Sequence, residues 1–180
     1  ESAWGNLRES VVEEADGATA SQQAITETRS LINDLQELGK TGTGPTAKIR
    51  AQAVKLLNET QGLLETLPEK SPLRKALAPA WESASKAVSG SDDPTKWVGA
   101  AEALEKLGAI TAIGGLRRAV GSGNKVTQQE VMKFIDIFPG LTSSPGGVKR
   151  MLDYMEKVNM SVLDRQKFFN FFEQENRAHD

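Results

Sequence analysis

The chain has 180 residues, a formal net charge of −2, no cysteine and one histidine. The lack of cysteine excludes thiol chemistry, Cys-ligated zinc and disulfide bonds, and it fits a reducing cytoplasm. The near-neutral charge gives no global basic footprint for nucleic acid, and no window approaches the roughly eighteen consecutive apolar residues of a transmembrane span. A hydrophobic fraction of 38% is low for a compact globule, so we expect an elongated shape with long exposed faces.

The first predicted helix runs from about Ser2 to Leu38. Its apolar stripe advances in steps of three, four and seven residues, as one helical face requires: Leu7, Val11, Ala15, Ala18, Gln22, Ile25, Ile32 and Leu35. Gly17 weakens a helix by about 1 kcal/mol relative to Ala, so a break near Asp16-Gly17 is the alternative to one continuous helix. Gly39 suits the left-handed position that follows a helix.

Three further helices are expected before residue 121. The second spans about Pro45 to Leu67, with an inward face of Ile49, Ala53, Leu56, Leu57, Leu63, Leu64 and Leu67. The third runs from about Pro72 to Val88, and Pro79 should kink it or begin its second half. The fourth covers roughly Pro94 to Val120, with Asp93 as N-cap and Pro94 at the first helical position. Gly114-Gly115 bends this helix or lets a neighbour approach closely.

The last part of the chain contains two helix starts. Thr127 and Glu130 form a capping box that opens a short helix ending near Phe138, and Ser144 caps a final helix from Pro145 to about Arg177. No segment alternates apolar and polar residues as a strand would. The sequence therefore predicts an all-α fold, an elongated bundle of about five to six helices with long first and last helices.

The predicted domain organisation separates a long N-terminal helix or arm, residues 1–40, from a helical bundle domain, residues 41–180. We expect the two to form one continuous unit. Because the chain begins with Glu1 rather than Met, we expect a processed product or an excised part of a longer chain.

Motifs that could carry chemistry have simpler explanations. Gly39-Lys40-Thr41 lacks the glycine five residues earlier that a phosphate-binding loop needs, and no strand precedes it. Glu9 and Glu82 each precede a serine, like the general acid of lytic transglycosylases, but the other elements of that family are absent. His179 is the only histidine, which excludes a His-based triad or a multi-His metal site. We therefore expect no enzymatic activity, no metal and no cofactor.

The last predicted helix carries an unusual cluster of aromatic residues. Four of the six phenylalanines fall within five positions, and adjacent helical residues are about 100° apart, so they cannot share one narrow face. Either this helix end is buried on several sides, or one face is offered to a partner. The partner hypothesis, which includes self-association into a homo-oligomer, names Phe168, Phe169, Phe171, Phe172, Met155 and Val162.

A small basic cluster is the second candidate site. Arg117, Arg118 and Lys125 could contact phosphate groups or the acidic face of a partner. The alternative is a favourable interaction of basic side chains with the dipole at a helix C-terminus.

The order of turns and caps resembles a helical module of tailed-phage and prophage structural proteins, described as minor structural, internal virion or DNA-ejection proteins. The first matching part is Thr26 to Leu35, followed by the turn Thr43-Gly44-Pro45. The second is Val126-Thr127-Gln128-Gln129-Glu130, then Phe138-Pro139-Gly140-Leu141, then Thr142-Ser143-Ser144-Pro145 with Gly147. Gly146 stands where this family usually has an acidic residue.

The resemblance implies a virion component with no active site to transfer. We therefore expect a non-enzymatic structural or assembly component of a bacteriophage particle, in the ejection or head–tail apparatus. Its partners would be other virion proteins, and it would reside in the virion or, during assembly, in the host bacterial cytoplasm. The alternative is a cellular helical adaptor that binds partner helices.

Overall fold

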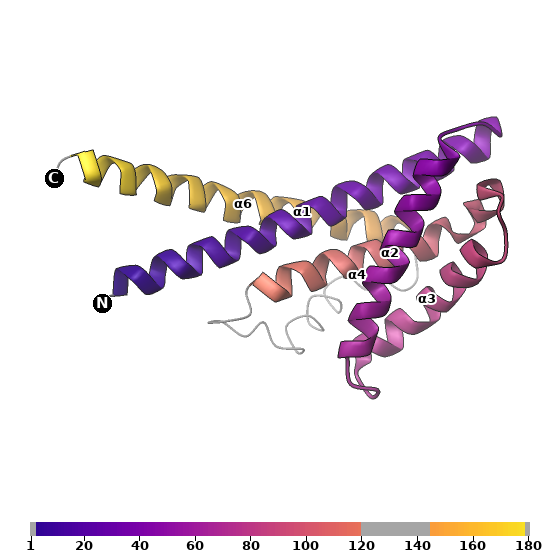
Figure 1. The fold of residues 1–180 in the computed structure, drawn as a ribbon, viewed down its shortest axis with the longest axis horizontal. Helices are drawn as coiled ribbons and strands as arrows, with labels where there is room; N and C mark the ends of the chain where they lie inside the picture. The colour runs from indigo at the N-terminus through magenta and orange to yellow at the C-terminus, as the bar shows by residue number, and fades with distance from the viewer. Residues whose placement is uncertain (1–2, 120–144, 179–180) are drawn as a thin grey trace.

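The computed structural model describes residues 3–119 and 145–178, and every regular element in these ranges is helical. The elements are α1 (Ala3–Thr41), α2 (Thr46–Thr66), α3 (Pro72–Ser89), the 3₁₀ helix η1 (Pro94–Ala100), α4 (Ala101–Ala119) and α6 (Pro145–Ala178). With 39 and 34 residues, α1 and α6 are the longest of them. The predicted all-α, elongated fold with long first and last helices is confirmed (Figure 1).

Helix α1 runs along most of the length of the molecule, and α6 lies antiparallel beside it, so that both termini lie at the same end (Figure 1). Helices α2 and α4 pack against the opposite half of α1, and α3 packs against α2 and α4 (Figure 1). The core lies in this half, where helical residues at three- and four-residue spacing turn their apolar side chains inward. Its largest fully buried side chains are Trp97, Ile25, Leu31, Leu35, Leu38, Ile49, Leu77, Leu104, Leu107, Met151, Leu152 and Met155.

The inward face predicted for α2 is confirmed. Every inward residue predicted for the second helix is buried, from Ile49 to Leu67. On α6, Val148, Met151 and Leu152 are buried in the same core. The C-terminal half of α1 contributes Ile25 to Leu38 to that core, so this part of the helix belongs to the bundle.

Helix starts follow the expected chemistry. The Asp93 carboxylate accepts a hydrogen bond from the Thr95 backbone N–H at 3.0 Å, as an N-cap should. Hydrogen bonding to the side chain of Thr95, and then to its backbone, lowers the pKa of Asp93. The element that Asp93 opens is 3₁₀ over Pro94–Ala100 before the chain becomes α-helical, which the sequence analysis did not predict. Ser71 caps α3 by accepting from the Arg74 N–H at 3.4 Å, with Pro72 at the first helical position.

Two tryptophans attach the segments around α2 to one another. Trp97 of η1 is fully buried and donates its indole N–H to the Ser91 carbonyl at 3.2 Å. The Arg50 guanidinium lies 5.5 Å from the centre of the Trp97 ring, a cation–π distance. Trp81 of α3 donates to the Leu57 carbonyl of α2 at 3.0 Å. These contacts satisfy the polar edges of two large apolar rings.

The predicted end of the first helix was wrong by three residues. Helix α1 continues through Gly39 to Thr41, and Gly42 has the left-handed backbone, with φ 69°. Its N–H donates to the Leu38 carbonyl at 2.8 Å. A Cβ on Gly39 would lie 3.1 Å from Val98 Cγ1, so the lack of a side chain at Gly39 allows α1 to pack closely against η1. Gly42, and not Gly39, takes the left-handed conformation that ends the helix.

The first helix is continuous, as predicted, and the alternative break at Asp16-Gly17 is absent. Helix α3 runs through Pro79, and α4 runs through Gly114-Gly115. The predicted capping box at Thr127, the helix end near Phe138 and the Ser144 cap lie outside the described residues. Within α1, the predicted stripe is buried from Val11 onward except for the half-buried Gln22, but Leu7 is exposed because it lies beyond the core.

Helices α1 and α4 approach one another closely at Thr28 and Gly108. A Cβ on Gly108 would lie 2.1 Å from Thr28 Oγ1 and 2.3 Å from Thr28 Cγ2, which is well inside van der Waals contact. The Thr28 hydroxyl donates to the Ala24 carbonyl at 2.7 Å, so its polar group is satisfied within α1. Glycine at position 108 is therefore a packing requirement of the helix crossing.

Replacing Gly108 with Ala should lower the free energy of unfolding by about 1–3 kcal/mol, because the added methyl overpacks the crossing. Gly62→Ala is the matched control, since Gly62 lies within α2 and a Cβ there meets nothing within 4 Å. That change should raise stability by up to about 1 kcal/mol through helix propensity. Urea unfolding followed by circular dichroism measures both, and similar effects of the two changes would contradict the close approach.

Candidate protein-contact surface

Helices α1 and α6 meet along a seam of small and polar side chains. Ala15, Ala18 and Ser21 of α1 are buried, and Asn159 of α6 is fully buried opposite them. The Asn159 side-chain amide donates to the Ser21 hydroxyl at 3.0 Å. The two buried polar groups can form this hydrogen bond in only one alignment of the helices, so the pair fixes the register of α6 against α1.

Charged residues reinforce the seam on its edge. Arg29 of α1 bridges two carboxylates of α6, Glu156 at 2.6 Å and Asp153 at 2.5 Å. Gln22 donates to the second oxygen of Glu156 at 3.1 Å. The hydrogen bond from Arg29 is the largest cause that lowers the pKa of Glu156, with Gln22 adding to it and desolvation opposing it.

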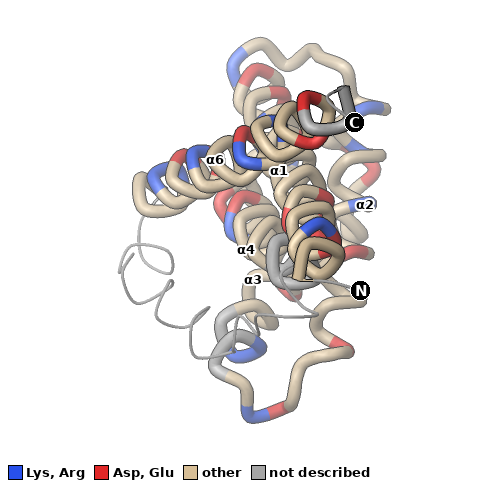
Figure 2. The backbone as a smooth tube through the Cα atoms, turned by 90° about the vertical axis from the view of Figure 1, so that its left-hand side faces the viewer, with Lys and Arg blue, Asp and Glu red and all other residues tan. Residues whose placement is uncertain are grey.

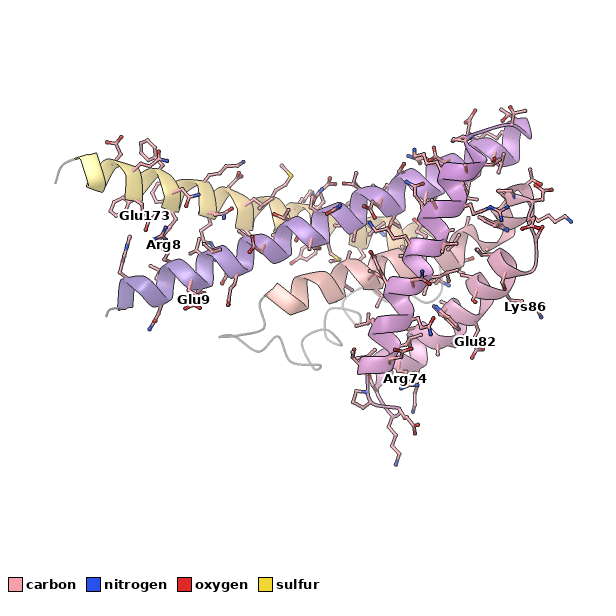
Figure 3. All side chains as sticks on the ribbon, viewed as in Figure 1. Arg8, Glu9, Arg74, Glu82, Lys86 and Glu173 are labelled. Atoms are coloured by element: carbon pink, nitrogen blue, oxygen red, sulfur yellow. The ribbon has the colours of Figure 1, made fainter. Side chains whose placement is uncertain are left out.

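Beyond the seam the two helices continue as a two-helix arm, which we define as residues 3–16 of α1 and 160–175 of α6. Arg165 lies 3.2 Å from Glu14, and Arg8 lies 3.5 Å from Glu173. Figure 3 shows Arg8 and Glu173 pointing toward one another from the two helices. Both acidic and basic positions occur along the two helices near this end (Figure 2). These pairs connect the arm at its solvent-exposed edges, where each contributes little free energy.

The end of the arm carries an aromatic cluster. The Trp4 ring stacks on Phe169, with centroids 5.1 Å apart and an interplanar angle of 25°. Phe172 lies 6.1 Å from the same ring, tilted by 50°. We name Trp4, Leu7, Phe168, Phe169, Phe171 and Phe172 the aromatic end. Five of these side chains remain exposed: Phe168 70%, Phe171 60%, Phe172 47%, Leu7 47% and Trp4 45%.

The structure divides the six residues of the partner hypothesis into three groups. Phe168, Phe171 and Phe172 lie on the surface, whereas Phe169 and Val162 are half-buried. Met155 is 1% exposed within the core, so its assignment to a partner-binding surface is corrected: this side chain already packs in the bundle. Phe169 and Phe172 lie beside Trp4 of α1, whereas no ring contact is described for Phe168 and Phe171. Binding of a partner at these residues stays a prediction.

Sequence reasoning missed Trp4 and placed Leu7 on an inward face. The available signal was the similar length of the first and last helices. Antiparallel pairing of two such helices brings the first turns of one beside the last turns of the other. Trp4 then becomes a neighbour of the phenylalanine cluster, although more than 160 residues separate them along the chain.

The second candidate site begins at the end of α4. Arg117 and Arg118 lie in the last turn of this helix, while Lys125 lies outside the described residues. A phosphate contact at these positions stays a prediction.

The carboxylates considered for acid–base chemistry do not come together. Glu9 and Glu82 are exposed on α1 and α3, far apart in the molecule (Figure 3). Gly39-Lys40-Thr41 forms the last turn of α1. Within residues 3–119 and 145–178, no three His, Cys, Asp or Glu side chains are grouped closely enough to hold a metal ion.

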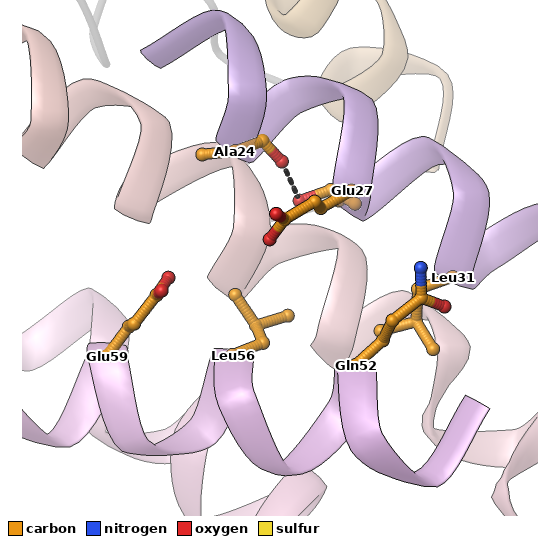
Figure 4. Close-up of a pocket in the computed structure, with 7 residues that line it drawn as sticks. Ala24, Glu27, Leu31, Gln52, Leu56 and Glu59 are labelled. Carbon is orange, nitrogen blue, oxygen red and sulfur yellow. Dashed lines mark hydrogen bonds between the residues drawn. The ribbon is translucent and has the colours of Figure 1, made fainter. Parts of the chain in front are cut away.

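A polar hollow of about 230 Å³ lies between α1, α2 and α4, beside a smaller pocket where Glu27 of α1 faces Glu59 of α2 (Figure 4). The Lys55 ammonium lies 2.7 Å from Glu27 and 3.9 Å from Glu59. Its hydrogen bond to Glu27 is the largest cause that raises the pKa of Lys55, so the lysine stays protonated. The charges of this hollow therefore join α1 to α2 as ion pairs.

The fold and this surface define an all-α protein with a two-helix arm that ends in exposed aromatic side chains. Among the described helices, none is long and apolar enough to cross a membrane. No protein-family model, curated protein or solved structure matches the chain.

Replacing Glu156 with Gln should reduce stability in a pH-dependent way. Because the folded-state pKa of Glu156 is lowered, its ionised form contributes stability above the unfolded pKa, and this contribution is lost as the pH falls through the folded pKa. The variant should be less stable by about 0.5–1 kcal/mol at neutral pH, with the difference shrinking below about pH 4. Urea unfolding across this pH range measures it. An exposed control, Glu82→Gln, should show no such trend, and a constant difference for Glu156→Gln would contradict the Arg29 contact.

The neighbouring residues Phe168 and Phe169 give a second matched pair. Phe169→Ala removes the ring stacked on Trp4 and should lower the free energy of unfolding by about 1–3 kcal/mol. Phe168→Ala changes an exposed ring and should stay within about 0.5 kcal/mol of the parent. Chemical unfolding measures both. Equal losses would mean that the whole cluster is structural.

Proposed function

We propose that the protein is a non-enzymatic structural or assembly component of a tailed-phage virion, acting in the ejection or head–tail apparatus. The observation that carries the proposal is the aromatic end, where five large apolar side chains are 45–70% exposed at the end of a projecting arm. Exposed apolar clusters of this kind mark protein contacts. A protein with such a surface functions by binding other proteins.

The sequence resemblance supports the phage part of the proposal. Its first matching part, Thr26 to Leu35, lies on α1 and includes Arg29, which joins α1 to α6. The turn Thr43-Gly44-Pro45 connects α1 to α2. Most of the second matching part falls between residues 126 and 144, outside the described residues. The partners would be other virion proteins, met in the host bacterial cytoplasm during assembly and retained in the particle.

The long helices support an assembly role on physical grounds. Residues 3–16 and 160–175 add little to the core, yet they carry most of the exposed large apolar side chains. Such an arm projects from the bundle and places the aromatic end at a distance from the core, where a partner can contact it. Several copies of the chain arranged in one particle would each offer the same surface.

The alternative function is a cellular helical adaptor that binds partner helices. The same aromatic end favours it, since amphipathic helices dock on exposed apolar helix faces. The two functions differ in where the protein resides and in whether its copy number is fixed.

Particles purified by density gradient from a culture that carries this gene test the proposal. Quantitative mass spectrometry with labelled peptide standards should find the protein at a constant ratio to the major capsid protein, as expected for a component that recurs in rings. An abundant host protein measured in the same fractions controls for contamination. If this protein instead follows the host marker, the adaptor function replaces the virion function.

A further inference from the structure

We propose that the aromatic end binds a basic amphipathic helix of another protein, in preference to a second copy of this chain. The proposal rests on the proposed function as an assembly component and names the chemistry of its partner.

The first argument is the net charge of the arm. Residues 3–16 and 160–175 contain seven carboxylates and three basic side chains, a net charge of −4, whereas the whole chain carries −2. The arm therefore concentrates negative charge around its exposed aromatic residues. Two arms brought together would place like charges side by side, which opposes association, whereas a cationic partner would be attracted.

The second argument is that the arm already uses its own basic side chains. Arg8 pairs with Glu173, Arg165 with Glu14, and Lys167 with Asp164 at 3.0 Å. All three cations in the two described segments are therefore engaged with carboxylates of the same arm. A second copy would bring further carboxylates without a new cation to meet them, while a Lys- or Arg-rich partner would supply one.

The third argument is the pattern on one face of α6. Met160, Asp164, Phe168, Phe171 and Glu175 follow one another at steps of four, four, three and four residues, so they share a face. Met160 is 56% exposed, like the two rings further along. Apolar side chains flanked by carboxylates on one helix fit a partner helix with apolar residues on one face and basic residues beside them. The aromatic rings can also accept the cations by cation–π contact.

The occupant is a helix because the surface consists of two antiparallel helices. Leu7 lies one turn after Trp4 on α1, and Phe171 lies one turn after Phe168 on α6. A third helix packed along them would place its side chains at three- and four-residue spacing against both. The described part of this end has no strand edge on which an extended peptide could add.

The test uses the full chain and two fluorescently labelled peptides of about 18 residues, long enough to span the arm as a helix. One peptide has Leu and Trp on one helical face and Lys on the other, and its isomer has Glu in place of each Lys. Fluorescence anisotropy should show that the basic peptide binds at least about tenfold more tightly, and that binding weakens as ionic strength rises.

Two pairs of variants locate the binding surface. Phe168→Ser with Phe171→Ser should weaken binding of the basic peptide by about tenfold, because the apolar anchors are lost. Its control, Val54→Ser, changes an exposed apolar residue on α2 and should have no effect. Asp164→Lys with Glu175→Lys, which changes the two carboxylates on the face of Phe168 and Phe171, should weaken binding by about fivefold, while the control Glu82→Lys on α3 should not.

Four outcomes would overturn the proposal. Equal affinity for the two peptides would contradict a basic partner. Binding that no arm variant weakens would contradict the aromatic end as the binding surface. Sedimentation equilibrium showing a dimer that Phe168→Ser with Phe171→Ser abolishes would make a second copy the occupant. Loss of helical content in that variant, measured by circular dichroism, would make the two rings structural. None of these outcomes changes whether the protein is found in particles, so the virion function is tested separately.

Discussion

The close approach of α1 and α4 at Thr28 and Gly108 determines how the rest of the molecule is arranged. Because Gly108 has no side chain, Thr28 can pack against the backbone of α4, and its hydroxyl is satisfied by the Ala24 carbonyl of its own helix. Leu31 and Leu35 of α1 are buried in the same core as Leu104 and Leu107 of α4. The crossing thus fixes α1 near its middle and leaves its first turns beyond the core, where, among the described helices, α6 accompanies them (Figure 1).

Periodicity in the sequence predicts much of this fold, because each core-facing helix has one buried stripe. The inward face of α2 from Ile49 to Leu67 is an example. The cap at Asp93 is equally predictable, since its acceptor and Pro94 act within one turn. The end of α1 is not predictable in this way. Gly39 and Gly42 are both suited to a helix end, and the choice depends on Val98, which lies far along the chain.

The candidate site shows the same division between local and long-range information. The spacing of Phe168 to Phe172 indicates that the four rings cannot share one narrow face, because adjacent helical residues are about 100° apart. Which ring is covered depends on the register of α6 against α1, fixed by contacts such as Asn159 with Ser21. For the same reason, Met155 and Phe168 belong to one helix but meet different surroundings, core and solvent. A helical wheel contains the angle of each residue and no information on where a neighbouring helix ends.

The length of α1 has a mechanical consequence. Trp4 lies 24 residues before Thr28, which corresponds to about 36 Å of continuous helix. A rotation of α1 by about 5° at the crossing would therefore displace the end of the arm by about 3 Å, roughly the width of an atomic contact. Since Arg29, Ser21 and Glu14 all hold α6, both helices of the arm would move as one lever. Small changes of packing around Gly108 would thus shift the distant aromatic residues by an amount that grows with the length of the helix.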